Sequence, residues 1–180
     1  MKLFYSKEII SSRLVRYTDV GYKSDPHKAR SQTGYLFCYN GTTISWRFTK
    51  KTLVATFTNH FEIISLYEAG KECVWLRSVI SHIQNICQIT SVNNSPIIIY
   101  EDNDVCVVQV RERYIKGDKT KHISPKFFYT HELQESRQVD IKQIRSVDNL
   151  ANLFTKALPT STFEKLVYGI GMRRVNKLQD

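Results

Sequence analysis

Hydrophobic residues gather in three short segments within the first fifty positions, separated by polar stretches. The segments 14–19, 33–39 and 42–48 are rich in β-branched, aromatic and aliphatic residues, which is typical of β-strands. Asn40-Gly41 joins the second segment to the third, and this dipeptide favours the positive φ angles of a tight hairpin turn. Residues 21–30 combine polar side chains with Gly and Pro and therefore predict a loop. The pattern predicts an antiparallel meander of three strands.

A longer segment with a different period follows at residues 60–86. Its apolar positions recur every three or four residues, which is the spacing of one face of an α-helix. The stripe consists of Ile63, Leu66, Gly70, Cys73, Leu76, Ile80 and Ile83. We therefore expect one long helix. Trp46 and Trp75 lie in apolar-patterned elements, so we expect them in the core rather than as stacking platforms for bases.

The second half of the chain alternates short helices and strands. Ile97–Tyr100 is a continuous apolar run, which predicts a buried central strand in parallel pairing. Asn103 or Asp104 suits the cap of a following helix, whose apolar side would carry Val105, Val108 and Tyr114. The remaining predicted elements are helices near 125–136 and 149–155, a strand at 139–144, and a last helix from a capping box at 161–164 to Gly169.

This order of elements indicates a mixed α/β fold, in which an antiparallel meander is followed by strands reached through helices. In such sheets reactive groups collect where neighbouring central strands end. Two predicted strands end on an acid, Asp19 and Asp102, and Glu62 stands just before the apolar stripe of the long helix. We therefore expect these three carboxylates within metal-bridging reach of one another.

Carboxylates without a neighbouring His or Cys cluster suit a hard divalent cation, because Mg²⁺ prefers oxygen ligands and keeps several waters. Two such ions held by acids can activate a water and stabilise the leaving oxygen of a phosphodiester. The same residues have an ordinary interpretation, with Asp19 and Asp102 as turn residues and Glu62 as a helix N-terminal acid favoured by the dipole. The spacing alone leaves both interpretations open.

The charge of the chain favours a polyanionic partner. The 180 residues include 26 Lys plus Arg against 17 Asp plus Glu, which gives a formal net charge of +9. Much of this charge lies in the segment 111–126, which predicts a basic loop. A solvated loop without a partner is the other interpretation. The candidate contacts to a nucleic-acid backbone are Arg113, Lys116, Lys119, Lys121 and His122.

The sequence disfavours membrane proteins, secreted proteins and proteins built on zinc sites or disulfides. No stretch approaches the roughly 20 apolar residues that span a bilayer, and charge interrupts the N-terminus where a signal peptide needs an apolar core. Cys38, Cys73, Cys87 and Cys106 are scattered, which favours reduced, mostly buried thiols over a zinc site or disulfide framework. We expect an intracellular protein, cytoplasmic or nuclear and not secreted, that is monomeric and does not contact a membrane.

Many short motifs, in one order along the chain, carry a resemblance to a known family. They are Tyr17-Thr18-Asp19, Arg30–Phe37, Ile44–Arg47, Val54-Ala55, Glu62 with Leu66 and Trp75–Arg77, Tyr100–Asn103, Lys119–Ile123 and Leu150–Pro159. From about Leu14 to Gly171, the chain resembles the ribonuclease H domain at the C-terminal end of the retrovirus-related Pol polyprotein of copia-type retrotransposons.

The resemblance implies a ribonuclease H-like fold with a five-stranded mixed sheet, which agrees with the pattern. It also implies hydrolysis of the RNA strand of RNA–DNA hybrids with two Mg²⁺ ions, for which Mn²⁺ substitutes. Asp19, Glu62 and Asp102 match the family's metal-ligand positions and, with Asn152, make up the expected catalytic and metal site. Asn152 stands where the family places an aspartate, and the segment around Glu62 has drifted, with His60 replacing an acid.

These departures leave two function classes open. In the first, the chain is a Mg²⁺-dependent ribonuclease weakened by Asn152. In the second, it is a truncated, diverged and inactive copy that binds nucleic acid or protein. A DNA-cleaving or strand-transferring enzyme of the same broad fold is a weaker third class, against which the Lys119–Ile123 and Leu150–Pro159 motifs argue. We expect a leader over 1–12, the ribonuclease H-like domain over 13–157, and a C-terminal helix and tail over 158–180.

Overall fold

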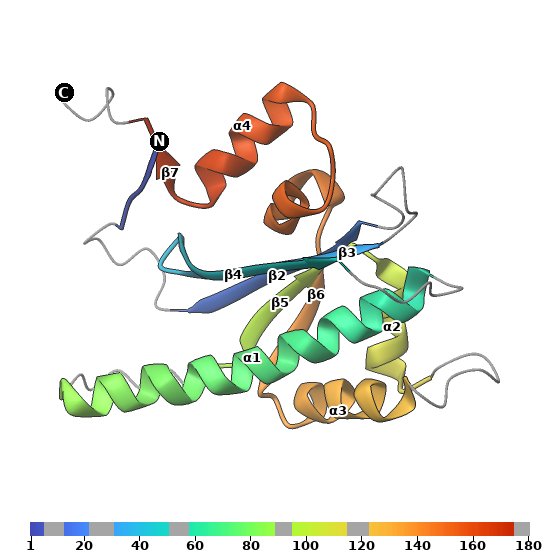
Figure 1. The fold of residues 1–180 in the computed structure, drawn as a ribbon. Coiled ribbons are helices and arrows are strands. Elements are labelled where there is room, and N and C mark those ends of the chain that lie inside the picture. Colours follow the sequence, from blue (N-terminus) through green and yellow to red (C-terminus); the bar gives the residue numbers. More distant parts are fainter. Residues whose placement is uncertain (6–12, 22–30, 51–57, 89–94, 115–122, 175–180) are drawn as a thin grey trace.

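Five strands form a central sheet that has helices on both faces (Figure 1). The computed structural model describes residues 1–5, 13–21, 31–50, 58–88, 95–114 and 123–174. In spatial order the strands are β4 (Thr42–Lys50), β3 (Gln32–Tyr39), β2 (Leu14–Gly21), β5 (Ile97–Glu101) and β6 (Val139–Gln143). β2, β3 and β4 pair antiparallel, whereas β5 is parallel to both β2 and β6. The predicted mixed α/β sheet with its three-strand meander is confirmed.

The hairpin between β3 and β4 turns at the predicted dipeptide. Asn40 and Gly41 have φ angles of 51° and 75°, and a two-residue turn with both values positive matches the right-handed twist of its strands. The register shifts between Phe37 and Cys38, where a β-bulge interrupts the ladder.

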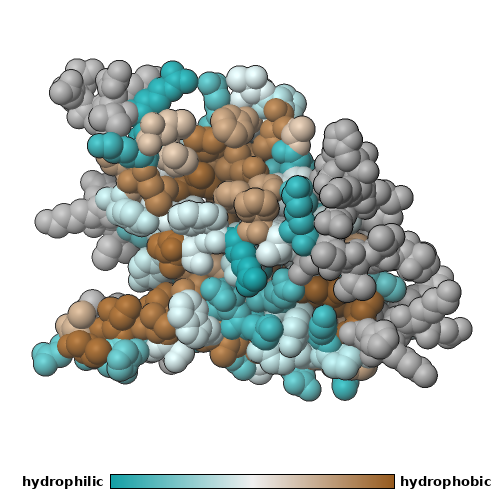
Figure 2. All heavy atoms as spheres, in the orientation of Figure 1, coloured by the Kyte–Doolittle hydropathy of each residue, from teal (hydrophilic) through white to brown (hydrophobic). Residues whose placement is uncertain are grey.

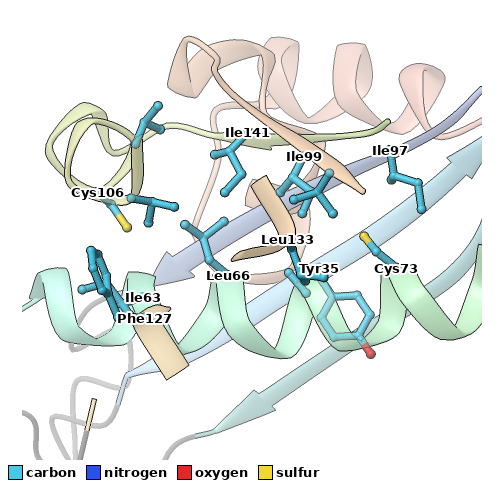
Figure 3. Close-up of a cluster of buried hydrophobic side chains, with 14 of the residues drawn as sticks. Tyr35, Ile63, Leu66, Cys73, Ile97, Ile99, Cys106, Phe127, Leu133 and Ile141 are labelled. Carbon is cyan, nitrogen blue, oxygen red and sulfur yellow. The ribbon is translucent and has the colours of Figure 1, made fainter. Parts of the chain in front are cut away.

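Three helices cover one face of the sheet (Figure 1). They are α1 (Thr58–Ile86), α2 (Asp104–Glu112) and α3 (Ser124–Glu135), with Asn103 capping α2 as predicted. Their apolar sides meet β5 and its neighbours in the main core, because burial of these side chains removes apolar surface from water. Figure 3 shows part of this core, in which Ile63, Leu66 and Cys73 of α1 lie beside Ile97, Ile99, Ile141 and Phe127.

The opposite face is covered by the C-terminal part of the chain. Two 3₁₀ helices, η1 (Ser146–Asp148) and η2 (Leu150–Phe154), lead into α4 (Thr160–Gly169). Leu150, Leu166 and Ile170 pack there against Leu36 and Cys38 of β3. Two short strands, β1 (Lys2–Leu3) and β7 (Met172–Arg173), pair beyond α4. The C-terminal helix thus packs on the same sheet, while the boundary expected after residue 157 stays a prediction.

Both tryptophans lie on the surface, so their predicted place in the core is wrong. Trp46 is 58% exposed and Trp75 is 57% exposed. Trp46 belongs to β4, which is an edge strand of the sheet, and Trp75 lies one position away from the buried Leu76 on α1. Edge position and helical rotation therefore decide their exposure, rather than the apolar character of the surrounding segments.

The predicted apolar side of α2 is also wrong. Val105, Val108 and Tyr114 are exposed, whereas the buried side chains of the helix are those of Cys106, Val107 and Val110. The cap at Asn103 sets where the helix begins, and the parallel strands beneath it select the face that turns inward.

The ends of the other helices refine two further predictions. α1 continues past the sheet (Figure 1), and Ile83, the last residue of the predicted stripe, is exposed there with Ile86; Figure 2 shows hydrophobic residues gathered over this end. α4 begins at Thr160 after Pro159 without a side-chain cap, so the capping box predicted at Ser161 is wrong.

None of the helices in the described ranges has the length and apolar character needed to cross a membrane.

Candidate active site

Three elements bring acidic side chains to one edge of the sheet. Asp19 lies near the end of β2, Asp102 directly follows β5, and Glu62 lies in the first turns of α1. β2 and β5 are parallel neighbours, so their carboxyl ends meet at the same edge. Asp19 and Glu62 are buried, and Asp102 is mostly buried.

The ammonium of Lys156 lies between two of these acids. Its Nζ is 2.8 Å from Asp19 Oδ1 and 3.2 Å from Asp102 Oδ2, so one cation bridges a carboxylate of β2 and a carboxylate that follows β5. It is also 3.3 Å from Ser146 Oγ. The Thr155 hydroxyl donates a hydrogen bond to the other oxygen of Asp19. The segment after η2 therefore supplies the cation and one donor of the site.

A glycine on β3 allows this segment to approach. Gly34 pairs with Asp19 across the antiparallel ladder. A Cβ atom at residue 34 would lie 2.9 Å from the Thr155 methyl carbon and 3.2 Å from Phe154 Cβ, which is closer than ordinary contact. Because Gly34 has no side chain, Thr155 and Lys156 come within hydrogen-bonding distance of Asp19.

A second pair of acids, Glu62 and Glu101, adjoins Asp19 and Asp102. Glu62 and Glu101 are both buried and joined by a side-chain hydrogen bond, and Glu101 Oε1 accepts the Asn103 N–H at 3.2 Å. Burial raises the pKa of both carboxyls well above the usual range; Asp19 and Asp102 add repulsion at Glu62, and Glu62 adds it at Glu101. Two hydrogen-bonded carboxyls in such surroundings are expected to share a proton.

The charges of Asp19, Asp102 and Lys156 partly compensate one another. Burial raises the pKa of Asp19 and repulsion from Asp102 adds to it, although Lys156 and Thr155 act in the other direction. Burial alone would lower the pKa of Lys156, but the charges of Asp19 and Asp102 and their hydrogen bonds outweigh it, and the pKa is raised. The ammonium form of Lys156 is therefore favoured.

Asn152 lies beside this cluster, in η2. Its Nδ2 donates hydrogen bonds to the Ser146 carbonyl oxygen at 2.5 Å and to Ser146 Oγ at 3.1 Å. Its Oδ1 is buried and has no hydrogen-bond partner among the described residues. Asn149 fixes the start of η2, because its Nδ2 donates to the Thr18 carbonyl oxygen at 2.8 Å and its Oδ1 accepts the Ala151 N–H at 3.1 Å.

The donors of this site suit a cation, and a cation is already built into it. Asp19 and Asp102 supply carboxylate oxygens to one positive charge, and the buried Oε2 of Glu62 has no partner in the described part of the chain. Within the described ranges, no three His, Cys, Asp or Glu side chains are arranged as ligands of a single metal ion. The ammonium of Lys156 lies between Asp19 and Asp102, the two acids that would both have to contact the metal ion. The side chains fit Mg²⁺ in donor type, with the lysine in the position between them.

Comparison with known proteins agrees with this architecture. The chain matches no protein-family model. It is 27% identical over 156 residues to the retrovirus-related Pol polyprotein from transposon TNT 1-94 of Nicotiana tabacum, across 87% of this chain and 11% of that protein. It is 28% identical over 162 residues to the transposon Ty1-NL2 Gag-Pol polyprotein of Saccharomyces cerevisiae, across 86% of this chain and 8% of that protein. The chain thus spans about a tenth of the length of these relatives.

The structure of LC11-RNase H1 in complex with an RNA/DNA hybrid has the same fold, with a TM-score of 0.51 and 16% identity over 76% of this chain and 88% of that chain. The chain has a ribonuclease H-like fold and is similar in sequence to retrotransposon Pol polyproteins. The resemblance read from its motifs and the predicted fold are confirmed. The roles of Asp19, Glu62, Asp102 and Asn152 as metal ligands stay predictions.

Most predicted nucleic-acid contacts of the ribonuclease H-like domain lie outside the described residues. These are Lys116, Lys119, Lys121 and His122. Arg113 is described: it ends α2 in a left-handed conformation, is exposed, and places its guanidinium 5.7 Å from the Phe128 ring. Its contact with nucleic acid stays a prediction.

Sequence reasoning missed four side chains of the domain's site, namely Glu101, Ser146, Thr155 and Lys156. Thr155 and Lys156 belong to a motif that carried the resemblance, yet nothing in the local pattern pairs them with an acid more than 130 positions away. Glu101 directly precedes Asp102 at the end of an apolar strand. A second acid at that position could have indicated from the sequence that Glu101 belongs to the site.

Proposed function

We propose that the domain is a metal-dependent nuclease that hydrolyses the RNA strand of RNA–DNA hybrids. The observation that carries this proposal is the convergence of Asp19 and Asp102 on one cation beside the buried carboxyl of Glu62. Further support comes from the fold shared with LC11-RNase H1, whose structure contains an RNA/DNA hybrid, and from the retrotransposon relatives.

In this proposal Asp19, Glu62 and Asp102 hold the metal, and the unpartnered Oδ1 of Asn152 supplies a neutral oxygen. When bound, two Mg²⁺ ions would supply an activated water and neutralise charge at the leaving oxygen. The chain itself positions Asp19 and Asp102 near the ends of two paired strands and Glu62 on α1. Asn149 anchors η2, and the absence of a side chain at Gly34 lets the Asn152–Lys156 segment approach these acids. The basic residues at 113–122 would contact the backbone of the hybrid.

A cleavage assay tests the proposal. Purified protein is incubated with an RNA–DNA hybrid labelled on its RNA strand, in Mg²⁺, in Mn²⁺ and in chelator, with single-stranded RNA and duplex DNA as competing substrates. We expect slow, metal-dependent cleavage of the hybrid. Cleavage should be faster in Mn²⁺, because N- and O-containing sites generally bind Mn²⁺ more tightly than Mg²⁺. Asp102→Asn should abolish cleavage and leave the fold intact. Cleavage that persists in chelator or in Asp102→Asn would contradict the assignment.

A second candidate is an inactive domain that binds nucleic acid or protein through the same surface. It is favoured by Asn152, whose amide is engaged with Ser146 and has no negative charge for a second metal ion. Binding of the hybrid without cleavage in any metal, including high concentrations of Mn²⁺, would select this candidate.

A further inference from the structure

Lys156 lies where a divalent ion would have to contact Asp19 and Asp102. Its Nζ is 2.8 Å and 3.2 Å from oxygens of these two acids, and within the described ranges no other single atom joins them. Mg²⁺ binds carboxylate oxygens at about 2.0–2.1 Å and needs near-octahedral geometry. The ammonium and a metal ion therefore cannot share this position.

The lysine has a route out of the site. Its side chain is 35% exposed, whereas those of Asp19 and Asp102 are 1% and 11% exposed, so the cation enters from the solvent side of the acids. A lysine has a flexible four-carbon stem and compact charge that can move to water without disturbing the backbone. The Asn149 bonds that anchor η2 do not involve Lys156.

We infer that Lys156 is an internal counter-ion of the metal-free domain, and that a divalent ion binds by displacing it from Asp19 and Asp102. This inference rests on the proposed function, because it takes these two acids as metal ligands. Without Lys156, the buried Asp19 and the mostly buried Asp102 would face each other with no positive charge between them, which costs stability. With it, the metal-free acid pair is stable and the metal has to compete.

Metal binding in the absence of nucleic acid tests the inference. Lys156→Gln removes the charge and largely keeps the length of the side chain. Lys165→Gln is the matched control, because Lys165 is an exposed lysine that pairs with Asp148 on η1. Calorimetric titration with Mn²⁺ should show at least about tenfold tighter binding to Lys156→Gln than to the wild type or the control, since a like charge at contact distance is removed. Equal or weaker binding by Lys156→Gln overturns the inference.

Thermal melting separates competition from a merely structural role. In chelator, Lys156→Gln should melt below the wild type, and Mn²⁺ should raise its melting temperature more than that of the wild type. A loss of equal size with and without Mn²⁺ would mean that Lys156 only stabilises the fold, and would overturn the inference.

A measurement on the unaltered protein covers the case in which the variant does not fold. The rate of acetylation at Lys156, followed by peptide mass spectrometry, should rise several-fold when Mg²⁺ is added, while the rate at Lys165 stays constant. An unchanged rate under conditions where calorimetry shows bound metal overturns the inference alone. If calorimetry shows no metal binding to the wild type or to Lys156→Gln, both the inference and the metal-dependent function fail.

Discussion

Arg16 is a fully buried cation whose three guanidinium nitrogens have no hydrogen-bond partner in the described part of the chain. Its Cζ lies 4.3 Å from the ring centre of Tyr35 and 5.0 Å from that of Phe37, so stacking replaces ion pairing. Burial lowers its pKa to about 10, against smaller opposing effects of neighbouring groups. Because this value lies below that of the unfolded chain, the cost of burying the charge is present in full at neutral pH.

Arg16→Met should therefore stabilise the domain. Methionine is flexible, fills irregular spaces and needs no hydrogen bonds. We expect the free energy of unfolding in urea to rise by about 1–2 kcal/mol, as replacing buried charge with apolar groups often does. Arg16→Ala is the control, since it removes the charge but leaves a cavity. A loss of stability in Arg16→Met as large as that in Arg16→Ala would show that stacking on Tyr35 and Phe37 outweighs the burial of charge.

Asn152→Asp should restore the missing charge and increase cleavage. Changes to groups around a metal commonly alter affinity or activity by about 10–100-fold, and we expect a gain of that order at limiting Mn²⁺. The metal-free protein should become less stable, because a carboxylate at this position cannot donate the two hydrogen bonds that Asn152 donates to Ser146. Cleavage rates and melting in chelator measure the two effects. No recovery at any metal concentration would favour the inactive binding domain.

At the scale of residues, the sequence predicts the positions of the acids better than it predicts which side chains contact them. Asp19 lies near the end of one apolar strand and Asp102 directly follows another, and that local signal is sufficient to place them at one edge of the sheet. The contact of Lys156 with Asp19 joins residues 137 positions apart and depends on the missing side chain of Gly34. No local pattern of hydrophobicity contains that information.

At the scale of elements, η2 and the residues that follow it depend on close approach to β3. Gly34→Ala should place a Cβ against the Thr155 methyl group and destabilise the domain by about 1–3 kcal/mol, as overpacking of a core does. Because the approach is needed for the hydrogen bonds to Asp19, the variant should also bind Mn²⁺ differently from the wild type.

A second substitution identifies the atom responsible. Thr155→Ser removes the methyl carbon that lies 2.9 Å from the added Cβ and keeps the hydroxyl that donates to Asp19. In urea unfolding, Gly34→Ala with Thr155→Ser should recover much of the stability lost by Gly34→Ala alone. If the two changes are merely additive, the destabilisation has another origin, such as the Phe154 contact at 3.2 Å.

Elements were predicted well where their signal is local. The Asn40-Gly41 turn, the stripe of α1 and the cap at Asn103 each depend on residues within a few positions of one another. The inward face of α2 and the exposure of Trp46 depend on which strands lie beneath a helix and which strand ends the sheet. Those are properties of the assembled layers, so periodicity alone did not predict them.

At the scale of the whole molecule, the net charge of +9 should make nucleic-acid binding sensitive to salt and nearly independent of base sequence. Fluorescence anisotropy from about 50 to 200 mM salt should show a steep loss of affinity, as for proteins with several phosphate contacts. RNA–DNA hybrid should compete better than duplex DNA, because 2′-hydroxyls in a wide minor groove distinguish RNA.

Neutralising Lys116, Lys119 and Lys121 together tests whether this binding is localised. We expect weaker binding and a shallower salt dependence. The matched control removes the same number of charges at Lys142, Lys165 and Arg174, three exposed cations of β6, α4 and the C-terminal region. Equal losses in the two triple variants would mean that net charge, and not the 111–126 segment, directs the binding.

The long separation between Asp19 and Lys156 also bears on how the domain folds during synthesis. The meander, α1 and β5 all precede residue 102, so most of the sheet can form while the last third of the chain is still inside or just beyond the ribosome. Until η2 and α4 emerge, Leu36 and Cys38 have no cover and Asp19 has no lysine beside it. Closing so long a loop is a late event. We therefore expect nascent chains of this domain to pass through a state with a nearly complete sheet, one bare apolar face and an uncompensated acid pair, and to need a chaperone most during that interval.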